Sequence, residues 1–61
     1  MTSNELFTNM KTLWESFEEN HTTFTDKGNK AAATRARKSV GEIKKLVTEY
    51  RKASVDESKR S

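Results

Sequence analysis

One short break separates two segments of this sequence that both carry the spacing of apolar residues found on helices. The break is Asp26-Lys27-Gly28-Asn29, and the chain contains no proline and only one other glycine. Gly28 suits the left-handed conformation that ends a helix, and Asn29 suits the N-cap of the next helix. The sequence therefore predicts an all-α fold, an antiparallel helical hairpin with its turn at residues 26–29.

The first segment predicts a helix over about residues 3–25. Thr2 and Glu5 have the spacing of a capping box, in which the hydroxyl accepts from the amide of Glu5 and the carboxylate reaches back. Apolar residues then recur every three or four positions, which is the pattern of one helical face. The stripe consists of Leu6, Met10, Leu13, Phe17, His21 and Phe24, flanked by Phe7 and Trp14.

The second segment predicts a helix over about residues 30–53. It opens with three alanines, which have the highest helix propensity. Gly41 costs about 1 kcal/mol inside this helix without ending it. We expect residues 1–54 to form the hairpin and residues 55–61 to form a charged, flexible tail. One face of the helix carries Ala32, Ala33, Ala36, Val40, Ile43, Val47 and Tyr50, with Leu46 at its border.

The apolar stripe of the first segment is too wide for one partner helix to cover. A domain of 61 residues buries only about 60% of its unfolded surface, and this chain has no cysteine for a disulfide. Oligomerisation is the remaining route to stability. We therefore expect a homodimer in which two hairpins form a four-helix bundle.

The two segments carry opposite charge. Residues 1–26 have one base against five acids, a net charge of −4, whereas residues 27–61 have eleven bases against four acids, a net charge of +7. No acid interrupts the bases between Lys27 and Lys38. Such a positive field attracts polyanions, so nucleic acid is the first partner to consider.

Most of these bases fall on one sector of the second predicted helix, roughly opposite its apolar face. Thr34, Gly41 and Thr48 lie among them, and their short side chains let a phosphate backbone approach. Arg35 lies outside this sector, where it can pair with an acid of the first helix or contact phosphates of a second strand. The candidate DNA-binding residues are Lys27, Lys30, Thr34, Arg35, Arg37, Lys38, Lys45 and Lys52.

The function that these residues predict is sequence-tolerant binding of double-stranded DNA. Lysine and arginine contact mostly phosphates, which carry no sequence code, and the chain has no Cys/His finger or RNP-type aromatic pattern. Phosphate contacts alone do not distinguish DNA from RNA. The main alternative is a small helical protein-interaction module whose basic helix docks on an acidic partner. A third interpretation is an ordinary solvated face with ion pairs within the helix.

Other classes of function find little support in the sequence. His21 is the only histidine, cysteine is absent, and no serine or threonine has a recognisable base beside it. We therefore expect no enzyme, no metal site, no cofactor and no small-molecule substrate. No apolar run approaches the ~18 residues of a membrane span, and no signal-peptide pattern is visible. We expect a cytoplasmic protein without membrane contact.

One stretch of the second segment resembles a known family. The strings Gly28-Asn29-Lys30-Ala31-Ala32-Ala33-Thr34-Arg35-Ala36-Arg37-Lys38-Ser39 and Tyr50-Arg51-Lys52-Ala53-Ser54 look like the core of the bacterial linker-histone-like nucleoid proteins first known from chlamydiae. The resemblance covers the second helix closely and the first by pattern. It implies a small DNA-binding, chromosome-organising protein of the nucleoid, in a short form without the lysine- and alanine-rich tail of the chlamydial members. Lys30, Arg35, Arg37 and Lys38 would match the family's basic motif.

Overall fold

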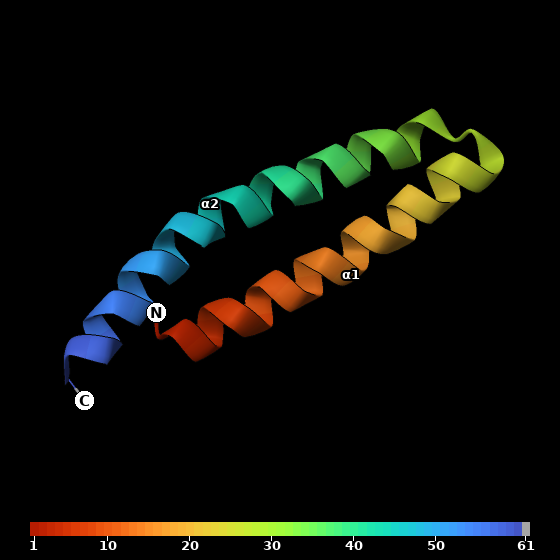
Figure 1. Ribbon diagram of the computed structural model, residues 1–61. Coiled ribbons are helices and arrows are strands. Elements are labelled where there is room, and N and C mark those ends of the chain that lie inside the picture. The colour runs from red at the N-terminus through yellow and green to blue at the C-terminus, as the bar shows by residue number, and fades with distance from the viewer. Residues whose placement is uncertain (61) are drawn as a thin grey trace.

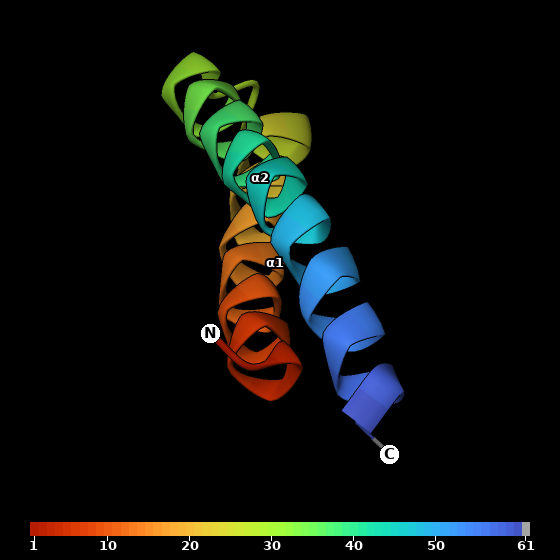
Figure 2. The ribbon, with the colours of Figure 1, turned by 90° about the vertical axis from the view of Figure 1, so that its left-hand side faces the viewer.

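The protein folds as two antiparallel α-helices joined by one tight turn (Figure 1). The computed structural model describes residues 1–60, with α1 at Ser3–Lys27 and α2 at Lys30–Arg60. The hairpin is a rod with extents of 48 × 14 × 13 Å. The start of α1 and the end of α2 lie at the same end of this rod, and α2 runs on past the start of α1 (Figure 2). The predicted all-α helical hairpin is confirmed.

The turn forms as its residue types predict. Gly28 has a φ of 64°, and its amide donates to the carbonyl of Phe24 at 2.8 Å, which closes the last turn of α1. A side chain at this φ would be strained, so glycine is required here. The Asn29 side-chain oxygen accepts from the amide of Ala32 at 3.1 Å and so caps the start of α2. The two helices are thus reversed within two residues, 28 and 29.

The start of α1 is also capped, although not in every detail of the predicted box. The Thr2 hydroxyl accepts from the Glu5 amide at 3.2 Å, as expected. The Glu5 carboxylate lies 3.2 Å from the same hydroxyl, which donates to it, in place of the predicted bond from the Thr2 amide. Both contacts stabilise the first turn, which has few backbone partners of its own.

The seam between the helices is built from small residues near the turn and from larger ones toward the open end. Ala32, Ala33, Ala36 and Ser39 are buried on α2 near the turn, whereas Leu6, which is 1% exposed, is buried near the open end. Small side chains let the helix backbones approach closely near the turn, so little side-chain volume is needed there to fill the space between the helices. The half-buried positions along the seam include Met10, Leu13, Phe17, Ile43 and Leu46.

The second helix is longer than predicted. Helix α2 continues to Arg60 instead of ending near residue 53, so residues 55–60 of the expected flexible tail are helical, and Ser61 lies outside the described residues. This additional stretch of α2 meets the start of α1 at the open end, where the Glu57 carboxylate accepts from the Ser3 amide at 2.7 Å and from the Ser3 hydroxyl at 2.6 Å. This Ser3–Glu57 contact satisfies an unpaired amide of the first turn of α1 and places an anion at the positive end of that helix.

The predicted apolar stripes are wider than the seam. Several of their large members remain accessible to solvent, with Phe7 at 56% and Trp14 at 53% of their full exposure. The other exposed members are His21, Phe24, Val40, Val47 and Tyr50. A two-helix hairpin therefore covers only part of its apolar surface.

Candidate nucleic-acid interface

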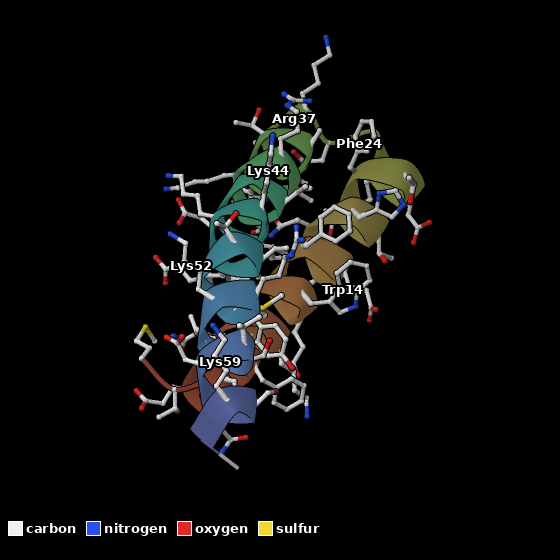
Figure 3. All side chains as sticks on the ribbon, turned by 60° about the vertical axis from the view of Figure 1, so that its left-hand side comes forward. Trp14, Phe24, Arg37, Lys44, Lys52 and Lys59 are labelled. Atoms are coloured by element: carbon white, nitrogen blue, oxygen red, sulfur yellow. The ribbon has the colours of Figure 1, made fainter. Side chains whose placement is uncertain are left out.

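All eight residues that the sequence nominates for DNA contact are exposed, and seven of them lie on α2. Lys27 is the last residue of α1, and Lys30 is the first of α2, so the positive surface begins at the turn. Figure 3 shows Lys52 on one edge of α2 and the aromatic rings of Trp14 and Phe24 on the other side, with Arg37 and Lys44 between them. The basic side chains are thus spread over the exposed surface of α2, and Arg37 among them borders the groove that contains Phe17, His21 and Phe24 of α1.

Arg35 stands apart from the other candidates. Its Nε donates to the side-chain oxygen of Asn20 on α1 at 2.9 Å. The partner is thus an amide next to Glu19 and not one of the acids that the sequence suggested. This bond crosses the seam near the turn and ties part of the Arg35 guanidinium to α1.

Thr34 is already engaged within its own helix. Its hydroxyl donates to the carbonyl of Lys30 at 3.2 Å and lies 3.3 Å from Nη2 of Arg37, from which it accepts. Thr34 therefore orients the guanidinium of Arg37, and its single hydroxyl proton is committed to the helix backbone.

The bases of α2 follow a seven-residue period that the sequence analysis missed. Basic pairs occur at Arg37-Lys38, Lys44-Lys45 and Arg51-Lys52. Seven residues are close to two turns of helix, so equivalent members of the pairs line up along the helix axis. Lys44 and Arg51 were left out of the candidate set for this reason, although both are exposed and extend it. The repeat itself is visible in the sequence.

The period divides the bases into two rows. The rim row consists of Lys30, Arg37, Lys44 and Arg51, and the flanked row consists of Lys38, Lys45, Lys52 and Lys59. In Figure 3, Arg37 and Lys44 of the rim row lie nearer to Trp14 and Phe24 than Lys52 of the flanked row does. Short residues, including Thr34, Gly41 and Thr48, lie between the two rows. A Cβ added at Gly41 would meet nothing within 4 Å, so the space between the rows is open at its centre.

Acids also repeat with the same period, and they lie beside one row only. Glu42, Glu49 and Asp56 each stand three residues before a member of the flanked row and four residues after another. These are the spacings at which side chains meet on a helix. Glu42 and Lys45 form an ion pair with a distance of 3.7 Å from Oε1 to Nζ. In the part of the chain that the structure describes, no member of the rim row forms an ion pair.

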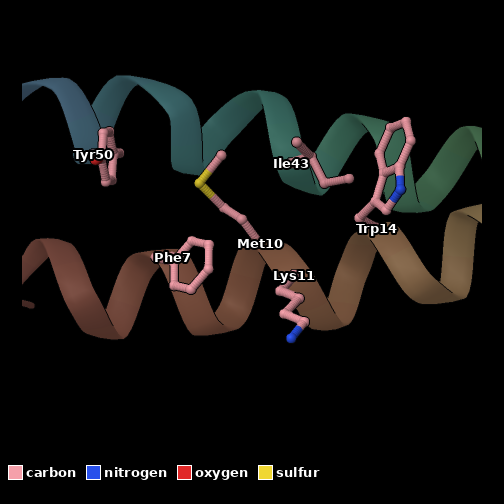
Figure 4. Close-up of a pocket in the computed structure, with 6 residues that line it drawn as sticks. All are labelled: Phe7, Met10, Lys11, Trp14, Ile43 and Tyr50. Carbon is pink, nitrogen blue, oxygen red and sulfur yellow. The ribbon is translucent and has the colours of Figure 1, made fainter.

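The exposed apolar residues form a continuous face beside the rim row. One groove of about 340 Å³ is lined by Phe7, Met10, Lys11, Trp14, Ile43 and Tyr50, with Met10 reaching across from α1 toward α2 (Figure 4). A second groove of about 280 Å³ nearer the turn includes Phe17, His21, Phe24 and Val40. The rings of Trp14 and Phe17 are 5.2 Å apart and those of Phe17 and His21 are 5.9 Å apart, which joins the two grooves. Aromatic pairs at these distances attract one another.

The remaining site types find no support in the described residues. No group of three or more His, Asp or Glu side chains within residues 1–60 is placed to hold a metal ion. Neither of the two helices, over the residues described, combines the length and apolarity needed to cross a bilayer.

The rod-shaped helical hairpin and its long basic surface place this chain in the class of small, basic, all-helical proteins. Within that class, the family model described as histone H1-like protein Hc1 matches residues 4–60, which is nearly the whole chain. The chain belongs to this family. The resemblance to the chlamydial histone-like proteins is thus confirmed, and the protein is a histone-like, DNA-binding protein of the nucleoid. The family is one of nucleoid structural proteins and is not known for enzymes. No curated protein and no solved structure matches the chain.

Proposed function

We propose that this protein binds double-stranded DNA without strong sequence preference, through contacts of the basic side chains of α2 with phosphates. The observation that supports this most strongly is the placement of the bases. They lie along α2 from Lys30 to Lys59 and are all exposed; Arg35 is the one among them that forms a hydrogen bond with α1. A row of this kind matches the repeating negative charge of a duplex, and membership of the histone-like family independently supports a DNA-binding role.

Low sequence preference follows from the type of contact. The cations stand on long, exposed side chains, and long flexible lysines contact phosphates without reading a base pattern. Thr34 lies within the stretch of bases between Lys27 and Lys38, and its hydroxyl proton is bonded to its own helix. Affinity should therefore depend on salt more than on sequence.

We further propose that the binding unit is a dimer in which the apolar faces of two hairpins pack together as a four-helix bundle. The chain exposes 4922 Å², whereas a compact protein of 7.0 kDa exposes only about 4,000 Å². The excess of about 900 Å² is close to the ~800 Å² that each partner buries in a standard interface. Burying the faces around Trp14 would place Arg37, which lines the groove nearer the turn, at the edge of the interface and would leave the other bases of each α2 on the outside of the bundle. The dimer would therefore present two DNA-binding surfaces.

Protein interaction through the basic helix remains the alternative function. The apolar grooves around Trp14 favour contact with protein, and the same cations could bind an acidic partner. We assign the grooves to the second copy because they contain large apolar side chains, Phe7 and Trp14, that one hairpin leaves more than half exposed.

Fluorescence anisotropy on two unrelated duplexes across a salt series tests the DNA proposal. We expect similar affinities for both duplexes and a steep fall with salt, with a log–log slope of about −0.9 for each phosphate contact. Binding that ignores salt, or that strongly prefers one duplex, would contradict the proposal. The same series on duplex RNA decides whether the protein distinguishes the two polymers.

Sedimentation equilibrium tests the dimer, for which we expect twice the 7.0 kDa of one chain.

A further inference from the structure

We propose that the rim row, Lys30, Arg37, Lys44 and Arg51, holds the DNA backbone and that the flanked row contributes little. This inference rests on the proposed function and identifies which of its cations carry the binding. The two rows have the same number of bases and the same period, and all eight side chains are exposed, so these features do not separate the rows. What separates them is the position of the acids.

The flanked row is partly neutralised by its own helix. Each of its members has an acid three or four residues away on α2, and the pair of Lys45 with Glu42 is formed at 3.7 Å. A phosphate that approaches this row also meets the carboxylates of Glu42 and Glu49, which repel it. Releasing counterions by binding there is therefore less favourable, since part of the charge is already compensated.

The rim row has no acids of its own helix beside it. Its members have no acid three or four positions away on α2, because those positions hold alanine, glycine, valine, serine or threonine. The guanidinium of Arg37 is in addition oriented by the Thr34 hydroxyl at 3.3 Å, which lowers the cost of ordering it on a phosphate. Successive members are seven residues or about 10.5 Å apart, so the row spans about 32 Å, close to the ~34 Å of one turn of duplex.

A pair of double variants with matched composition separates the rows. Lys30→Gln with Lys44→Gln removes two rim lysines, and Lys38→Gln with Lys52→Gln removes two flanked lysines. Each pair is fourteen residues apart and lowers the net charge equally, and glutamine keeps the helix propensity of lysine. All four residues are exposed, so both variants should keep the wild-type helicity, which circular dichroism checks.

The readout is the salt dependence of anisotropy on a mixed-sequence duplex. The rim variant should lose about 1.8 units of slope and roughly 30-fold in affinity at 0.15 M salt, since each phosphate contact contributes about 0.9 to the slope. The flanked variant should lose less than about threefold, through the general loss of charge. Equal losses, or a larger loss in the flanked variant, would overturn the inference and leave the DNA proposal standing. A wild type that binds without salt dependence would overturn both.

A reverse experiment tests the cause. Glu42→Gln with Glu49→Gln removes the acids beside the flanked row, and Glu15→Gln with Glu18→Gln removes two acids from α1 with the same change in net charge. The first variant should bind DNA more tightly and with a steeper slope than the second, because it frees lysines next to the bound backbone. An equal gain in both variants would show that only net charge matters and would overturn the distinction between the rows.

Discussion

The two helices of the hairpin share one seam, but their outer surfaces differ in charge and in the size of their apolar side chains. Helix α1 brings the large apolar side chains and most of the acids, whereas α2 contributes small residues to the seam near the turn and carries nearly all of the bases. In the residues described, no carboxylate of α1 forms an ion pair with a cation of α2.

This difference shows how a chain of 61 residues can serve two purposes. The seam constrains only about one position in three or four on each helix, so the remaining surface of each helix is free to specialise. We infer that α1 mainly supports folding and association, while α2 supports contact with DNA. Substitutions that affect one helix and spare the other test this separation.

The largest expected effect is the loss of the buried side chain that α1 supplies at the open end. Leu6→Ala removes the one large side chain that is fully buried among the residues described, and it should cost about 2 to 5 kcal/mol of stability, which is much of the stability of so small a domain. Leu13→Ala, at a half-buried position, should cost clearly less. Urea denaturation followed by circular dichroism measures both. Equal losses of stability in the two variants would mean that the burial of Leu6 and Leu13 in solution differs from their burial in the single hairpin.

The next effect separates association from DNA contact. Phe7→Ser with Trp14→Ser should weaken the dimer at least tenfold, or about 1.4 kcal/mol, because both rings lie on the proposed interface. Val55→Ser is the control, since Val55 is 51% exposed and lies beside Thr48, Arg51 and Lys52 on the outer side of α2. Sedimentation equilibrium gives the dissociation constants. A larger effect of Val55→Ser would contradict the proposed interface, because it would place the interface on the outer side of α2.

The two glycines should respond in opposite directions to the same substitution. Gly28→Ala should destabilise the hairpin by about 1 kcal/mol, because its φ of 64° disfavours a side chain. Gly41→Ala should stabilise α2 by up to about 1 kcal/mol, because the added methyl group meets nothing within 4 Å. Thermal unfolding monitors both variants. Destabilisation by Gly41→Ala would show that the space between the two rows is occupied in the folded dimer.

The smallest effect concerns the contact between the first turn of α1 and the last turns of α2. Glu57→Gln should cost about 0.5 to 1 kcal/mol, since it weakens two short but exposed hydrogen bonds from Ser3. Amide hydrogen exchange should show faster opening of residues 55–60 and little change near Gly28. An unchanged exchange rate at the end of α2 would mean that this extension of the helix does not depend on Ser3.

Local signals in the sequence were sufficient to predict the hairpin. The break at Gly28, the Asn29 cap and the helical spacing act within a few residues, and the structure confirms each of them. The length of α2 was not predicted in this way, and the last turns of α2 make a contact between Ser3 and Glu57, which are distant in sequence. The separation of the apolar residues into a seam and an exposed face depends on how each helix is rotated about its axis, and spacing alone does not give that rotation.

The candidate binding residues were predicted as a set but not ranked. All of the nominated bases are exposed on the structure, which the helical period could indicate in advance. Their distinction into two rows was also present in the sequence, as the seven-residue repeat of Glu42 and Glu49 beside the lysines. It was missed because the bases were grouped by sector of the helix and not by their distance from acids. Arg35 differs, since its bond to Asn20 requires the packed hairpin.

The contact between Ser3 and Glu57 also bears on the order in which the protein folds. Forming it first would close a loop of nearly the whole chain, whereas contacts beside Gly28 close short loops at lower entropic cost. We expect folding to start at the turn and to reach this contact last. In stopped-flow experiments Gly28→Ala should then slow refolding, and Glu57→Gln should mainly speed unfolding. The contact would thus govern how long the folded hairpin persists, and the turn would govern how quickly it forms.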